Sequence, residues 1–107
     1  MSQDINRLLM ALERSMREIN REVINPEIPA LTLDDLRPVL HRVAKARASY
    51  LKALLDLGAR ADHAQAVAGE LDELARLRRE YEELASAAKA LETAIQRGYL
   101  DIRVDGG

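Results

Sequence analysis

Residues 5–23 have the sequence I-N-R-L-L-M-A-L-E-R-S-M-R-E-I-N-R-E-V, and they decide the fold class. Large apolar residues recur in this stretch at alternating spacings of four and three: Ile5, Leu9, Leu12, Met16, Ile19 and Val23. That pattern is the a/d seam of a helix that packs along one stripe, and it persists for nearly three heptads. Leu8 widens the stripe. Asn25-Pro26 then ends the segment, because a residue before proline is disfavoured in the α region. We therefore predict a helix over about residues 3–24.

A second helix is predicted after a loop at residues 25–32. Thr32 is suited to cap it, and Asp34 and Asp35 follow in the first turn, where the helix dipole favours acidic side chains. An apolar helical stripe then continues to Gly58, a residue type that commonly ends helices in a left-handed conformation. The second helix is expected over about residues 33–57.

A third, longer helix is predicted after a short turn at residues 58–61. Asp62 with Gln65 three positions later forms a capping-box pattern, and apolar residues with a mean spacing of 3.5 run on to Ile95. Gly98 closes the pattern. This helix is expected over about residues 62–97, with coiled-coil character.

The tail at residues 98–107 has a different pattern. Leu100, Ile102 and Val104 alternate with charged residues, which is typical of a half-buried strand. A strand needs a neighbour, and no other segment alternates in this way. Three outcomes stay open: pairing with the same segment of a second copy, addition to the sheet edge of a partner, or fraying.

Composition sets the class of the protein. The 107 residues contain no Cys and only 3% aromatic residues, and they carry a formal charge of −2. A disulfide scaffold, a zinc ribbon and a mostly β fold are therefore excluded. The beginning of the chain lacks a secretory signal pattern and no apolar run approaches the ~18 residues of a membrane span, so a cytoplasmic location without membrane contact is expected. We expect one domain over residues 1–107: an all-α antiparallel helical hairpin or three-helix bundle with a strand-like tail.

The unequal helix lengths predict a homodimer. The end of the third helix should project beyond the second, which would leave Ala88, Leu91 and Ile95 exposed in a monomer unless the loop with Ile28 and Leu31 folds over them. Paired third helices would cover that stripe, whether the first helix packs on its own chain or is exchanged with a second copy. The expected oligomer or partner interface consists of Leu71, Leu74, Leu77, Tyr81, Leu84, Ala88, Leu91, Ile95, Leu100, Ile102 and Val104.

The second helix carries five bases and no acid between Leu36 and Leu55. One interpretation is charge complementarity with the acidic segment between Gly69 and Leu84 of the third helix, which would fix the register of the hairpin. The other is an anion-binding face that meets phosphate or an acidic protein. The candidate residues for that face are Arg37, His41, Arg42, Lys45 and Lys52.

Enzymatic chemistry is not expected. The chain has no Cys nucleophile, no Gly-rich elbow around its serines and no phosphate-binding glycine motif. Neither His41 nor His63 stands in the Glu-x-x-His spacing of a metal site in a helical bundle. We therefore predict no catalytic residues, no metal and no cofactor.

The function predicted from the sequence is that of a non-enzymatic helical protein–protein interaction module: a small scaffold, adaptor or chaperone-like protein that acts as a homodimer and binds a protein partner. The apolar seams at residues 5–23 and 71–95 would carry the assembly. The alternative is a regulatory protein that binds nucleic acid or another polyanion through the basic face of the second helix.

Overall fold

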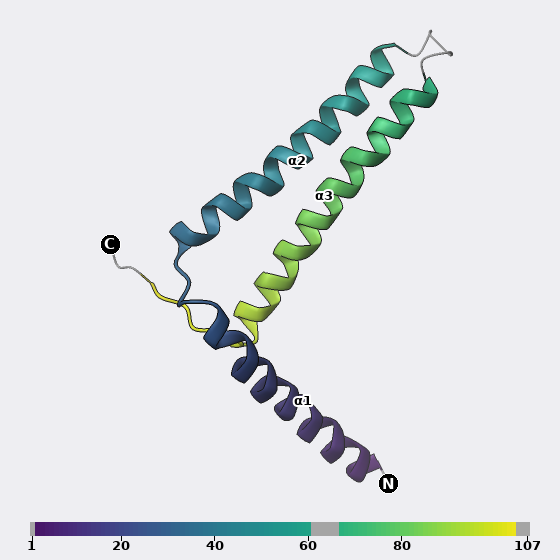
Figure 1. Cartoon of the computed structure of the whole chain (residues 1–107). Coiled ribbons are helices and arrows are strands. Elements are labelled where there is room, and N and C mark those ends of the chain that lie inside the picture. Colours follow the sequence, from purple (N-terminus) through teal and green to yellow (C-terminus); the bar gives the residue numbers. More distant parts are fainter. Residues whose placement is uncertain (1, 61–66, 105–107) are drawn as a thin grey trace. The chain divides into compact units, whose positions relative to one another are not determined.

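The computed structural model describes residues 2–60 and 67–104, and the described residues are all-helical (Figure 1). Helix α1 covers Ser2–Ile24 and is followed by a short 3-10 helix, η1, at Asn25–Glu27. Helix α2 covers Leu33–Ala59 and helix α3 covers Val67–Gln96. The chain divides into two compact units. The first consists of the described parts of Met1–Asp35 and Leu91–Gly107, and the second is Leu36–Ala90. Each is described by itself.

The second unit is a helical hairpin. Helices α2 and α3 run antiparallel in it (Figure 1), as the short connection predicts. Ala46 of α2 is buried, with 8% of its surface exposed. The ring centroids of Tyr50 and Tyr81 lie 6.2 Å apart, and the Arg47 guanidinium lies over the Tyr81 ring at 5.2 Å. These contacts confirm the predicted hairpin.

The first unit buries the end of α3. Ala94 and Leu100 are buried, with 9% and 3% of their surfaces exposed, and the polar Thr32 is buried beside the loop that follows η1. Gly98 ends α3 with φ of 72°, and the Tyr99 N–H donates to the Ala94 carbonyl at 2.9 Å. This left-handed glycine with a hydrogen bond across the last turn is a Schellman motif, so the predicted end of the helix is confirmed.

The start of α2 also forms as the sequence predicts. The Asp35 N–H donates to Thr32 Oγ1 at 3.2 Å, and the Thr32 N–H donates to Asp35 Oδ2 at 3.0 Å. These reciprocal bonds form a capping box. The bond from the Thr32 N–H, followed by a side-chain bond from Thr32, lowers the pKa of the Asp35 carboxyl below its ordinary value.

The C-terminal tail finds its neighbour within the chain. The Leu31 N–H donates to the Asp101 carbonyl at 3.0 Å, and the Arg103 N–H donates to the Leu31 carbonyl at 2.7 Å. The result is one isolated parallel bridge between Leu31 and Ile102. No strand is present in residues 2–60 and 67–104. None of the three outcomes expected for the tail included this internal bridge, because Leu31 lies outside any alternating pattern.

One expected helix boundary differs from the structure, and another cannot be compared with it. Helix α2 continues through Gly58 to Ala59, and Gly98 is the one glycine with positive φ among the described residues. The predicted left-handed stop at Gly58 is therefore wrong, and a helical φ at Gly58 lets the last turn continue. The predicted capping box at Asp62 lies outside the described residues. That the whole chain forms one domain stays a prediction.

The expected overhang of the third helix is wrong as a reason for self-association. Leu91 and Ile95 are half-buried, and Ala94 between them is buried. The end of α3 belongs to the same compact unit as the proline-containing loop and the tail. All three residues of the stripe that a second copy was expected to cover, Ala88, Leu91 and Ile95, are therefore partly covered within the single chain.

Gly69 lies in the first turn of α3, and a Cβ added there would meet nothing within 4 Å. We predict that Gly69→Ala raises the free energy of unfolding by about 0.5–1 kcal/mol, because Ala loses less backbone entropy in a helix. Urea unfolding followed by circular dichroism measures the change. Gly98→Ala is the matched control and should lower the same quantity by ~1 kcal/mol, because its φ is 72°. A destabilised Gly69→Ala would contradict the prediction.

Candidate functional site

Helix α1 exposes a continuous apolar face. None of its 23 residues is buried. Between 43% and 68% of the surface of each seam residue is open to solvent. The apolar face of α1 is defined by Ile5, Leu8, Leu9, Leu12, Met16, Ile19 and Val23. An apolar stripe of this length is normally the buried side of an amphipathic helix, so its exposure marks a docking surface.

The other side of α1 holds the C-terminal tail. Arg21 donates from Nη2 to Asp101 Oδ1 at 2.5 Å and from Nη1 to the Gly98 carbonyl at 3.0 Å. Just beyond the helix, the Asp101 N–H donates to Asn25 Oδ1 at 2.8 Å. We call this set of four residues the tail clamp. It joins residues about 80 positions apart in the chain through charge-assisted and neutral hydrogen bonds.

The tail clamp holds the tail on the side of α1 away from its apolar face. In a heptad that places Leu9 and Met16 at a, Arg21 occupies position f, on the opposite side of the helix. Its partners in the tail therefore lie on the side of α1 away from the seam. Residues 98–101 cannot cover the apolar face while they are held by Arg21.

The predicted α3 and tail interface is partly used within the chain. Leu74, Leu77, Tyr81, Leu84, Ala88, Leu91 and Ile95 are half-buried, and Leu100 is buried. Leu71, Ile102 and Val104 are exposed, with open fractions of 49%, 56% and 86%. The structure therefore brings most of this set into contact with the rest of its own unit. That the set forms an intermolecular interface stays a prediction.

The basic face of α2 is exposed along its length. Arg37, His41, Arg42, Lys45 and Lys52 all lie on the surface. Lys52 pairs with Asp56 of its own helix at 3.0 Å. Glu73 of α3 pairs with Arg76 of the same helix, whereas Glu70 pairs with Arg60, the residue directly after α2. No α2 base forms an ion pair with an α3 acid among the described residues, so the expected charge complementarity of the two helices is not realised through direct ion pairs.

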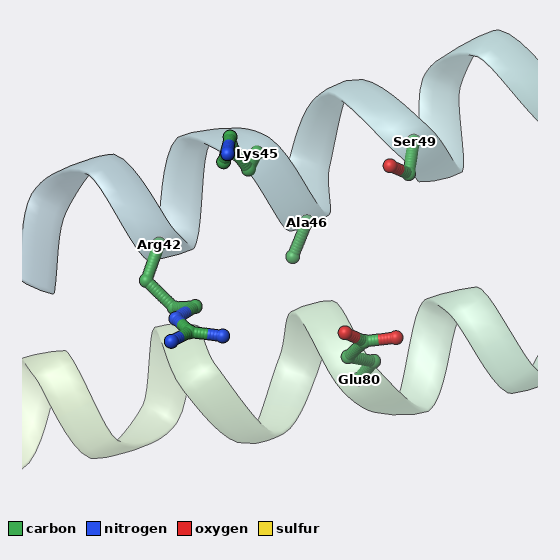
Figure 2. Close-up of a pocket in the computed structure, with 5 residues that line it drawn as sticks. All are labelled: Arg42, Lys45, Ala46, Ser49 and Glu80. Carbon is green, nitrogen blue, oxygen red and sulfur yellow. The ribbon is translucent and has the colours of Figure 1, made fainter.

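A surface hollow of about 200 Å³ lies between the two helices of the hairpin. Figure 2 shows Arg42, Lys45 and Ser49 on α2 and Glu80 on α3 around it. Glu80 also lies 3.6 Å from Arg76 of its own helix. The hollow thus combines two cations with a carboxylate, an arrangement that weakens its attraction for an anion.

The described residues show neither a metal cluster nor a membrane span. No group of three or more His, Asp or Glu side chains comes together in residues 2–60 and 67–104. In the same residues, no helix is both long and apolar enough to cross a bilayer. His63 lies outside the described residues.

Comparison with known proteins assigns no relative. The chain matches no protein-family model, no curated protein and no solved structure. The assignment of the candidate surface therefore depends on the residues of the chain itself.

The sequence-based list of interface residues omitted the α1 seam, although its heptad pattern was visible. The seam at residues 5–23 was expected to contribute to the assembly together with the seam at residues 71–95, but its residues were not named as interface residues. The tail clamp was also missed. A single pair such as Arg21 and Asp101 has no periodicity, so no sequence pattern marks it.

We predict that docking of the tail depends on pH. The side-chain hydrogen bond from Arg21, followed by the charge of Arg21, lowers the pKa of the Asp101 carboxyl below its ordinary value. A carboxyl with a lowered pKa in the folded state stabilises that state above its unfolded pKa, ~3.9, and loses the contribution as pH falls through the lowered value. The amide resonances of Leu31 and Arg103 should therefore keep their positions at neutral pH and shift to those of a released tail in strong acid.

Asp101→Asn is the control for that titration, because Asp35 also titrates in this unit with a lowered pKa. The variant loses the charge of the tail clamp at every pH. Already at neutral pH, its Leu31 and Arg103 amide resonances should lie closer to the positions that the wild type shows in strong acid, where its tail is released. A wild-type transition at or above the ordinary pKa of Asp would contradict the assigned cause.

Proposed function

We propose that this protein is a non-enzymatic helical interaction module that self-associates and docks a protein partner through the apolar face of α1. The observation that carries the proposal is a 23-residue amphipathic helix with no buried residue. The α2–α3 hairpin serves as the scaffold from which this helix is presented. Of the two seams expected to carry the assembly, at residues 5–23 and 71–95, the proposal thus favours the first.

Helix energetics support the proposal. Isolated helices gain little from backbone hydrogen bonds alone, and most helical stability in proteins comes from packing of an amphipathic face. The packing face of α1 is uncovered in the single chain. A partner that covers it would stabilise α1 and be bound in the same step.

The charge layout also supports docking. The four arginines of α1, at positions 7, 14, 17 and 21, all lie outside the a and d positions. They would stay in water when the seam is covered, so docking would not require burial of an unpaired charge. The surface is therefore suited to another apolar helix.

We predict that Leu12→Glu weakens self-association of the full chain at least ~100-fold, because it buries an unpaired charge in the seam. Sedimentation equilibrium at tens of micromolar should show wild-type species larger than the 12.0 kDa chain, and a monomer for the variant. Ala11→Glu is the matched control. It introduces the same charge at an exposed position outside the seam and should associate as wild type does.

Two outcomes would contradict the proposal for self-association. One is a wild-type chain that stays monomeric at all concentrations. The other is a Leu12→Glu variant that associates as strongly as Ala11→Glu, which would move the interface away from α1. Far-UV circular dichroism of both variants reports whether the hairpin is intact.

A second candidate function, polyanion binding by the basic face of α2, is favoured by one observation. Arg37, Arg42 and Lys45 are exposed and form no ion pair with the described residues. Lone cations aligned along a helix are a common phosphate-binding arrangement. Glu80, which lines the same hollow as Arg42 and Lys45, and the net charge of −2 oppose it, so we rank it below the interaction module.

Salt dependence tests the second candidate. Binding through phosphates predicts measurable affinity for a random DNA duplex at low salt, with a steep loss as salt rises. Lys45→Glu should then weaken binding at least ~10-fold, whereas Arg79→Glu on α3, the matched control, should change it little. Fluorescence anisotropy of a labelled duplex measures both. An absence of binding at low salt would eliminate this candidate.

A further inference from the structure

We propose that α1 of one copy pairs with α1 of a second copy, in parallel and in register, through the apolar face of α1. This inference rests on the proposed function. It specifies which molecule binds the apolar face of α1 and in which orientation. The tail clamp holds residues 98–101 on the opposite side of α1. Two α1 helices can therefore meet along their seams with both tails on the outside of the pair.

The seam is complementary to itself. With Leu9 and Met16 at a and Leu12 at d, every core position of the seam from Ile5 to Val23 is apolar. In a parallel, in-register pair each of these side chains meets the same side chain of the other copy. No position places a polar group of one copy against an apolar group of the other within the core.

The area available is close to what a specific pair needs. Seven side chains of each copy are about half exposed. At ~60 Å² each they contribute roughly 800 Å² of apolar surface to a pair. Flanking polar atoms bring the total near the lower limit of specific interfaces, about 1,000–1,200 Å². We therefore expect a pair that dissociates on dilution.

The flanking charges favour a second copy over a foreign helix. The e and g positions that border the seam carry only two charges, Glu13 and Glu22. Helices that select a foreign partner by charge commonly carry charges at most of these positions. The uncharged residues at the other border positions of α1 are Asn6, Leu8, Ser15 and Asn20.

The same charges select the parallel orientation. An antiparallel pair that covers the whole seam sets Ile5 against Val23 of the second copy, and this brings the two Glu13 carboxylates together near the twofold axis. Like charges at such positions are destabilising. A parallel pair sets Glu13 against Leu8 of the second copy, and Ser15 against Asn20. Within α1 it therefore brings no like charges together.

Single cysteines test this geometry in the full chain, which has no cysteine of its own. We predict that Ile5→Cys and Val23→Cys each form disulfide-linked dimers with themselves in a glutathione redox buffer. Arg14→Cys, on the opposite side of α1, is the matched control and should stay largely unlinked. Non-reducing electrophoresis at several protein concentrations measures the linked fraction. A coiled coil with Leu at a and Ile at d can contain more than two helices. An assembly larger than a dimer that forms the same disulfides would therefore also support parallel pairing of α1.

Failure of this inference is distinguishable from failure of the proposed function. If the wild type self-associates and Leu12→Glu abolishes association, but disulfides form only in a mixture of Ile5→Cys and Val23→Cys, the pair is antiparallel and only this inference is overturned. If Arg14→Cys links as efficiently as the seam variants, α1 does not pair through its seam. If the wild type is monomeric and no variant links, both proposals are overturned.

Discussion

The uncovered apolar face of α1 is the constraint on which the account of this protein depends. A helix in water is marginal without tertiary packing, and the seven apolar side chains of this face remain about half exposed in the single chain. The rest of the molecule is consistent with leaving it open. The hairpin of α2 and α3 packs its own tyrosine pair and Ala46. The loop and the tail shelter the end of α3 without using the seam.

The tail clamp determines which side of α1 the C-terminal tail occupies. Arg21 lies on the side of α1 opposite the seam, so its bonds to Asp101 and Gly98 keep the tail off the docking surface. The bridge between Leu31 and Ile102 attaches the next part of the tail to the loop that follows η1. A segment with a strand-like pattern thereby forms a bridge within its own chain.

The sequence predicted the local structure well because local structure has local causes. The heptads of α1, the capping box of Thr32 and Asp35 and the left-handed Gly98 each act within one or two helical turns. Predictions that needed distant contacts were poorer. The expected exposure of Leu91 and Ile95 is wrong, because both are half-buried in the single chain, and no pattern links Arg21 to Asp101. Glycine commonly ends helices, yet α2 continues through Gly58 to Ala59.

Amide hydrogen exchange of α1 as a function of protein concentration tests the central claim most directly. If pairing covers the apolar face, protection of the α1 amides should rise steeply with concentration, because association stabilises the helix, while protection within the α2–α3 hairpin stays constant. Protection of α1 that is independent of concentration across the micromolar to millimolar range would contradict the account.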